Sequence, residues 1–108
     1  MKKINSRAKG AAFERLIVNK INECLEVVGI EDRVSRNFDQ SWKAGLADIY
    51  FQNFCIECKR YGDGAEPAQE WWDQVLAATG EDEFPALIYK FNRRPIKVRI
   101  LAGTLVPE

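Results

Sequence analysis

The side chains best suited to chemistry are two carboxylates and a lysine in neighbouring runs of the chain. Residues 47–51 and 54–59 are rich in β-branched and aromatic side chains, which predicts two strands. Gln52-Asn53 between them has the length of a two-residue hairpin turn. Such a turn would set Asp48 directly opposite Glu57. Two acids would then face each other across the hairpin.

Side chains alternate along a strand, so the hairpin should have a charged face and an apolar face. Lys59 lies two residues beyond Glu57 and should point into the same space. The charged face is expected to hold Asp48, Tyr50, Cys55, Glu57 and Lys59, and the apolar face Ala47, Ile49, Phe51, Phe54, Ile56 and Cys58.

Opposed carboxylates about 5 Å apart destabilise a hairpin unless positive charge lies between them. A divalent cation would supply that charge. Oxygen ligands without histidine or thiolate on the same face favour Mg²⁺ or Mn²⁺ over zinc. Mg²⁺ usually takes only one or two carboxylates, with water and substrate phosphate as its other ligands.

A third acid lies on a long predicted helix. Apolar residues at helical spacing predict a helix from Ser6, as a capping residue, to about Val28, with Gly29 as its stop. Glu14 falls angularly within the apolar face of this helix. A buried carboxylate needs a partner or a metal, and the hairpin acids could provide either if the helix packs over their strands.

The other expected elements complete an α/β domain. Residues 33–38 alternate weakly and predict a strand, followed by a polar loop. A second helix is framed by Pro67 and Gly80, and strands are expected over 86–92 and 96–101. The order αβββαββ indicates a mixed β-sheet flanked by helices.

Composition narrows the possible functions. The chain has no histidine, which excludes Ser-His and Cys-His nucleophile pairs. Its three cysteines are an odd number, and Cys55 and Cys58 would point to opposite faces, so reduced core thiols are expected. Sixteen basic residues balance sixteen acidic ones, so only a local patch could attract a polyanion.

The 108 residues fit a single domain over 1–108, with 1–6 as a flexible tail. No apolar run is long enough to span a bilayer, and the first residues lack a signal-peptide core. We therefore expect an intracellular, cytoplasmic protein without a membrane partner.

The order and spacing of these acids resemble the PD-(D/E)xK nuclease superfamily, whose signature is a strand aspartate followed by an ExK tripeptide. Ala47 stands where many members carry a proline that is not a ligand. The more specific resemblance is to archaeal-type Holliday junction resolvases and similar phage enzymes. It rests on Lys9-Gly10-Ala11-Ala12-Phe13-Glu14-Arg15-Leu16, Arg36, Asp48, Glu57-Cys58-Lys59 and Gln69.

The resemblance implies a restriction-endonuclease-like core and hydrolysis of phosphodiester bonds to leave a 5′-phosphate. Asp48, Glu57 and the backbone carbonyl of Cys58 would hold the metal, with Glu14 assisting directly or through water. Lys59 would orient or deprotonate the attacking water and stabilise charge on the phosphate. Gln69 matches an accessory glutamine of the second helix.

Basic residues gather near both ends of the chain and could bind backbone phosphate. Solvated surface charge is the alternative for each of them. Trp71 and Trp72 are expected to fill the core or a subunit interface. The proposed nucleic-acid-binding residues are Lys9, Arg36, Arg93 and Arg94.

Three functions remain open from the sequence. The first is a structure-selective DNA endonuclease, resembling a junction resolvase, that acts as a homodimer because one short chain carries one site. The second is a restriction-type or repair-type nuclease without junction preference. The third is a non-catalytic nucleic-acid-binding module, against which the retention of Lys59 and all three acids argues.

Overall fold

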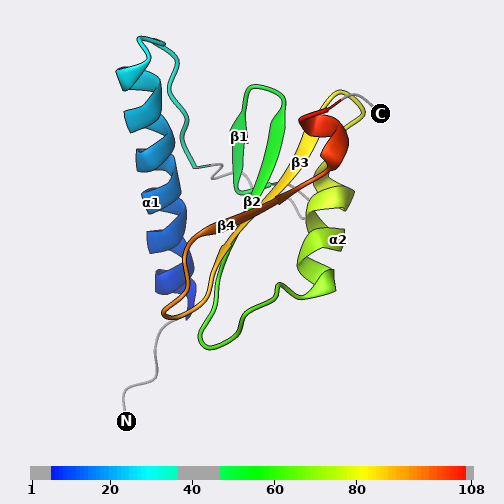
Figure 1. Cartoon of the computed structure of the whole chain (residues 1–108). Helices are drawn as coiled ribbons and strands as arrows, with labels where there is room; N and C mark the ends of the chain where they lie inside the picture. Colours follow the sequence, from blue (N-terminus) through cyan, green and yellow to red (C-terminus); the bar gives the residue numbers. More distant parts are fainter. Residues whose placement is uncertain (1–5, 37–46, 107–108) are drawn as a thin grey trace.

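The computed structural model describes residues 6–36 and 47–106 and has the predicted α/β architecture, with one four-stranded sheet between two helices (Figure 1). This arrangement is compatible with a restriction-endonuclease-like core. The elements are α1 (Ser6–Val27), β1 (Ile49–Phe51), β2 (Phe54–Arg60), α2 (Gln69–Ala78), β3 (Phe84–Lys90), β4 (Lys97–Ile100) and a short 3₁₀ turn, η2 (Ala102–Thr104).

The strands lie in the order β1-β2-β3-β4. β1 and β2 form an antiparallel hairpin, and Ile49 pairs with Ile56 as the two-residue turn predicts. Gln52 has a φ of 52°, the left-handed conformation that tight hairpin turns require. β2 and β3 are parallel because α2 carries the chain back across the sheet, and β4 returns antiparallel to β3.

Helix α1 ends as its glycine predicts. Gly29 has a φ of 77°, which is accessible to glycine at little cost. Its N–H donates to the carbonyl of Glu26 at 3.1 Å, and the N–H of Ile30 donates to that of Leu25 at 2.9 Å. This pair of bonds is the Schellman arrangement, which satisfies carbonyls left open at a helix end.

Each helix covers one face of the sheet. Phe13 and Ile17 of α1 pack with Ile49 and Ile56, the face predicted to be apolar. Trp72 and Val75 of α2 pack on the opposite face, together with Cys55, Leu87, Tyr89 and Phe91. The face predicted to be charged is thus also a packed core, into which Glu57 is inserted.

Two smaller predictions about side chains are wrong. Ala47 packs with the α2 core rather than the α1 core, because it precedes β1 and does not follow the alternation of the strand. All three cysteines are free, as expected, but Cys24 is exposed near the end of α1 rather than buried.

The strand predicted over 33–38 is reduced to one bridge, between Arg36 and Ile49. Side-chain bonds replace a longer ladder: Asn22 of α1 accepts from the N–H of Val34 at 2.8 Å and donates to its carbonyl at 3.1 Å. These bonds fasten the segment to α1, so its backbone groups do not need a neighbouring strand. The end of the predicted strand and the loop containing Trp42 lie outside the described residues, as does most of the predicted tail.

β3 begins at Phe84, before the predicted start at Ala86. Pro85 is accepted in this strand because the ladder with β4 begins only at Ala86, so no β4 donor or acceptor faces the proline. α2 begins at Gln69, after Pro67, and β4 begins at Lys97, one residue after the prediction.

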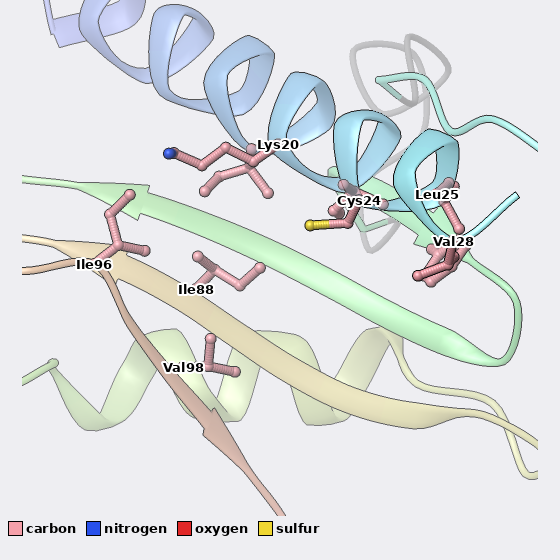
Figure 2. Close-up of a pocket in the computed structure, with 10 residues that line it drawn as sticks. Lys20, Cys24, Leu25, Val28, Ile88, Ile96 and Val98 are labelled. Carbon is pink, nitrogen blue, oxygen red and sulfur yellow. The ribbon is translucent and has the colours of Figure 1, made fainter. Parts of the chain in front are cut away.

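α1 leaves part of its sheet face uncovered. An apolar pocket of about 420 Å³ opens between α1 and the β3–β4 side of the sheet (Figure 2). Ile88, Ile96 and Val98 form its floor, and Cys24 and Leu25 lie on its helical wall. Within the described residues, neither helix is long and apolar enough to span a membrane.

Candidate active site

Asp48 lies immediately before β1, so it is next to the hairpin ladder rather than within it. The residue is only 6% exposed. Its Oδ2 accepts a hydrogen bond of 2.7 Å from the backbone N–H of Cys58, which ties the carboxylate to the middle of β2. Asp48 thus lies against β2 as predicted, but its contact is with the backbone N–H of Cys58, the residue after Glu57.

Glu57 is 1% exposed and is among the largest fully buried side chains of the protein. Its Oε2 accepts a long hydrogen bond of 3.4 Å from the side chain of Gln74 on α2. Its Oε1 receives no hydrogen bond from any described residue. A buried carboxylate oxygen without a donor is costly for a purely structural acid, and a proton or a bound cation at this oxygen would remove that cost.

Glu14 approaches Asp48 from α1, the helix on the other face of the sheet. Its Oε2 forms an ion pair with an Nη2 of Arg36 at 3.1 Å, and the two side chains are 14% and 25% exposed, respectively. Arg36 is held in place by the bridge to Ile49 and by the fastening of the preceding segment to α1. The negative charge of Asp48 is close enough to Glu14 to raise the pKa of its carboxyl.

Burial and the charge of Asp48 raise the proton affinity of the two glutamates of the cluster. Burial raises the pKa of Glu57 to about 8, and the negative charge of Asp48 adds to the shift, which Lys59 opposes. Burial and Asp48 likewise raise the pKa of Glu14 to about 7, against the opposing charge of Arg36. Near neutral pH the metal-free cluster therefore carries protons that exposed acids would have released.

Lys59 lies on β2 two residues after Glu57 and is half-buried. Its charge acts on Glu57, where it favours the ionised form. No ion pair engages the Lys59 side chain in the described part of the chain. The lysine is thus a neighbour of the acids but not the second half of a simple salt bridge with Glu57.

The donor set fits a hard divalent cation. Asp48 and Glu57 supply carboxylate oxygens, one of which lacks a donor among the described residues, and the chain contains no histidine. Within residues 6–36 and 47–106, no three acidic, cysteine or histidine side chains form a ready metal cage. Two carboxylates with water and phosphate as the remaining ligands is nevertheless the usual way in which proteins hold Mg²⁺.

Of the other predicted site residues, Arg36 contacts this cluster, and Gln69 and Arg93 contact acids outside it. Arg36 is at Glu14, whereas Gln69 is exposed at the start of α2 and donates to Asp73 at 3.0 Å, so its accessory role stays a prediction. Arg93 pairs with Asp63 at 2.7 Å. Arg94 is exposed beside Arg93.

The tryptophans fill the core side of α2 rather than the acidic cluster. Trp72 is buried, and the guanidinium of Arg99 stacks over it in a cation–π contact, 4.4 Å from the ring centroid. Trp71 is half-buried and stacks on Tyr61 with ring centroids 4.5 Å apart. Both tryptophans therefore belong to the core between α2 and the sheet, which is one of the two predicted alternatives, the other being a subunit interface.

Sequence reasoning missed Gln74, the α2 side chain that contacts Glu57. Its spacing from Trp71 was the available signal: three residues along a helix return to nearly the same face. Since Trp71 packs toward the sheet, Gln74 could have been placed near the strand acids once α2 was assigned to their face.

Comparison with protein families identifies a matching group, described as "Phage putative PDDEXK endonuclease", over residues 5–103. The chain belongs to this phage PDDEXK endonuclease family. The match includes every acid of the cluster and Lys59. PD-(D/E)XK nucleases generally use divalent metal ions, and the carboxylate oxygens of Asp48 and Glu57 are of the type that such ions prefer. No curated protein and no solved structure matched the chain.

Proposed function

We propose that this family member hydrolyses phosphodiester bonds in DNA with the help of Mg²⁺ or Mn²⁺, at the site formed by Glu14, Asp48, Glu57 and Lys59. The observation that carries the proposal is the convergence of three half-buried or buried carboxyls from two elements and a loop. Next to them is a lysine that has no ion-pair partner among the described residues. Groups with strongly raised pKa values gather at functional sites more often than at structural ones.

Asp48, Glu57 and the backbone carbonyl of Cys58 would hold the cation, with Glu14 binding it directly or through water. A bound cation lowers the pKa of water and neutralises charge on a phosphate oxygen. Arg36 keeps Glu14 oriented through their ion pair. The Cys58 N–H does the same for Asp48, so each acid enters the site already positioned.

Lys59 would contact the reacting phosphate or the attacking water. Its ammonium can donate hydrogen bonds to a phosphate oxygen and favours the build-up of negative charge there. Lys59 is close enough to Glu57 for its charge to lower the pKa of that carboxyl. It forms no direct ion pair with an acid among the described residues. This position suits a role in the chemical step better than one in folding.

The finer proposal is a structure-selective endonuclease, similar to Holliday junction resolvases and acting as a homodimer. Its support is the order of Glu14, Arg36, Asp48, Glu57 and Lys59 along the chain together with their grouping in space. Symmetrical cutting of two strands needs two sites, and one chain of this size carries one.

The test is cleavage of a labelled four-way junction and of a linear duplex of matched sequence, with Mg²⁺ or with EDTA. We expect cleavage only with Mg²⁺ and preference for the junction in direct competition. Equal cleavage of both substrates would favour a restriction-type or repair-type nuclease. Binding of either substrate without cleavage under any divalent ion would favour the non-catalytic module.

A further inference from the structure

A second cluster of charge lies beside the carboxyl ends of β2 and β3. Its centre is a pocket of about 250 Å³ whose lining, among the described residues, includes three cations and no carboxylate. Each cation comes from a different element, and each is half-buried. The lining residues are Lys9, Ala12, Phe13 and Leu16 of α1, Arg60 of β2 and Lys90 of β3.

The parallel register brings two of these cations together. Arg60 and Lys90 are partners at the end of the β2–β3 ladder, so neighbouring strands hold them about 4.8 Å apart at the backbone. Arg60 shares its strand face with Ile56, on which α1 packs. Lys9 approaches from α1, five residues before Glu14. Like charges placed directly opposite each other destabilise a sheet.

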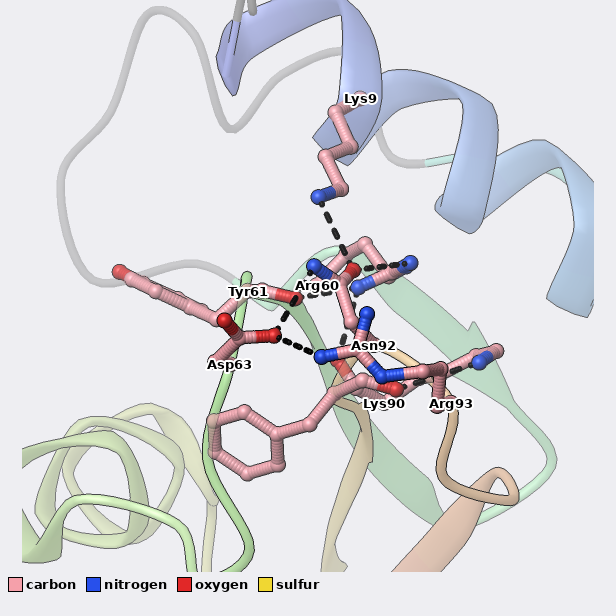
Figure 3. Close-up of polar contacts among 8 residues, drawn as sticks. Lys9, Arg60, Tyr61, Asp63, Lys90, Asn92 and Arg93 are labelled. Atoms are coloured by element: carbon pink, nitrogen blue, oxygen red, sulfur yellow. Dashed lines mark hydrogen bonds and ion pairs between the residues drawn. The ribbon is translucent and has the colours of Figure 1, made fainter.

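Neutral groups satisfy these cations within the fold. Oδ1 of Asn92 accepts from Arg60 at 3.0 Å and from Lys9 at 3.5 Å (Figure 3). The ammonium of Lys90 donates to two backbone carbonyls, at 3.2 Å and 2.8 Å. Asp63, the carboxylate drawn in the same view, is bound by Arg93 at 2.7 Å. The same Asp63 oxygen accepts from the amide of Asn92 at 3.5 Å, and no described carboxylate forms an ion pair with Lys9, Arg60 or Lys90.

We propose that the pocket between Lys9, Arg60 and Lys90 binds a phosphate group of the nucleic-acid backbone, away from the bond that is cut. Lysines and arginines are seldom buried without a partner, and here the head groups of Lys9 and Arg60 converge on the neutral Oδ1 of Asn92 beside the pocket. Guanidinium and ammonium groups together match phosphate oxygens well. This inference rests on the proposed nuclease function.

The position of the pocket suits a phosphate of the same strand that reaches the acids. Arg60 follows Glu57 by three residues, roughly 10 Å along the strand, and its side chain leaves β2 on the opposite face, so the pocket and the Glu57 carboxyl are at least this far apart. Backbone phosphates of one DNA strand advance about 3.4 Å along the helix axis for each nucleotide. A phosphate a few nucleotides from the reacting one would therefore lie within reach of the pocket.

Lys9 separates phosphate binding from a purely structural role. Arg60 also donates to the carbonyl of Lys90 at the end of β3, and Lys90 donates to the carbonyls of Phe91 and Arg94, so removal of either side chain would disturb the fold locally. Lys9 lies near the start of α1, and its contact with the rest of the fold is the long bond to Asn92. Lys20, an exposed lysine further along α1, provides a control with the same loss of charge.

The experiment measures binding of a fluorescent DNA duplex by anisotropy in EDTA, at several salt concentrations, with the full chain. Lys9→Gln should weaken binding about five-fold to ten-fold and lower the slope of log K against log salt by about one. Its melting temperature should match that of the parent. Lys20→Gln should retain the parent's affinity and slope.

Equal affinity and salt slope for Lys9→Gln and the parent would overturn the proposal. A second arm uses inorganic phosphate alone. Millimolar phosphate could stabilise the parent but not Lys9→Gln, while Lys9→Gln binds the duplex as tightly as the parent. That result would make the pocket a site for free anions and overturn its assignment to the nucleic-acid backbone. A parent that binds DNA through Lys9 but never cleaves it would instead contradict the proposed function and leave this site standing.

Discussion

The backbone N–H of Cys58 donates a hydrogen bond of 2.7 Å to Oδ2 of Asp48, which fixes the carboxylate beside Glu57 in the metal-free protein. The bond crosses from the residue before β1 to the middle of β2. It holds the two acids close despite their repulsion. The site is therefore preorganised by the backbone, and the cost of assembling it is met during folding.

Asp48→Asn should abolish cleavage and raise the stability of the metal-free protein by about 1–2 kcal/mol, because it removes the charge that raises the pKa of both other acids. The asparagine oxygen can still accept from Cys58. Cleavage and melting temperature are measured on the same preparation. Asp82→Asn, at an exposed acid, is the control and should change neither.

An Asp48→Asn protein that is unfolded would assign Asp48 a structural role. One that cleaves at the parent's rate would exclude the residue as a required ligand. Either result would contradict the assignment of Asp48 as a metal ligand whose charge destabilises the empty site.

The stability of the metal-free protein should fall as pH rises toward about 8. An ordinary glutamate with a pKa of 4.5 loses its proton well before folded Glu57, whose pKa is about 8, so the folded state binds the extra proton between these values. The contribution is fully present below pH 4.5 and is lost as pH rises through about 8. Glu14 acts in the same direction up to about pH 7.

Glu57→Gln removes this titration, so its free energy of unfolding should vary less between pH 5 and about 8 than that of the parent. Urea unfolding at several pH values in EDTA measures both proteins. A parent whose stability is flat or increasing over this range, after correction with the Glu57→Gln protein, would show that the glutamate is not held protonated.

Arg36→Gln should raise the pKa of Glu14 above its present value of about 7, because the guanidinium opposes the effects of burial and Asp48. Arg36→Lys keeps the positive charge and should therefore change the pKa of Glu14 less than Arg36→Gln does. Carboxyl ¹³C chemical shifts followed with pH report the value directly. If the pKa of Glu14 is the same in Arg36→Gln as in the parent, the Arg36–Glu14 ion pair does not stabilise the ionised form of Glu14 in solution.

Much of the site could be predicted from the sequence because a tight turn and strand alternation are local. Gln52-Asn53 set the pairing of Ile49 with Ile56, which carries Asp48 to the part of β2 that holds Glu57. The burial of Glu57 under α2 could not be predicted in the same way, since it depends on which face each helix covers. Side-chain bonds such as Asn22 to Val34 also replaced a predicted strand, because periodicity does not reveal competing partners.

Lys59→Ala should lower the turnover of DNA by two or more orders of magnitude while changing affinity and melting temperature little. One lysine is a small share of the phosphate contacts, and Lys59 makes no ion pair within the described residues that folding would lose. Lys59→Arg should rescue poorly because its larger, planar group stays protonated. Single-turnover rates under saturating Mg²⁺ compare the three proteins; equal rates would show that Lys59 takes no part in the chemical step.

Asp48 and Glu57 together should bind a divalent cation, and titration with Mn²⁺ followed by electron paramagnetic resonance tests this most directly. The measurement needs no DNA and no turnover, so it is independent of substrate choice. We predict that the parent binds Mn²⁺ at pH 8, more weakly at pH 6 where protons compete, and that Asp48→Asn and Glu57→Gln each weaken binding at least ten-fold. Exposed Asp82→Asn should bind as the parent does. Mn²⁺ binding of equal strength in the parent and in both site variants would contradict a metal site at these two acids.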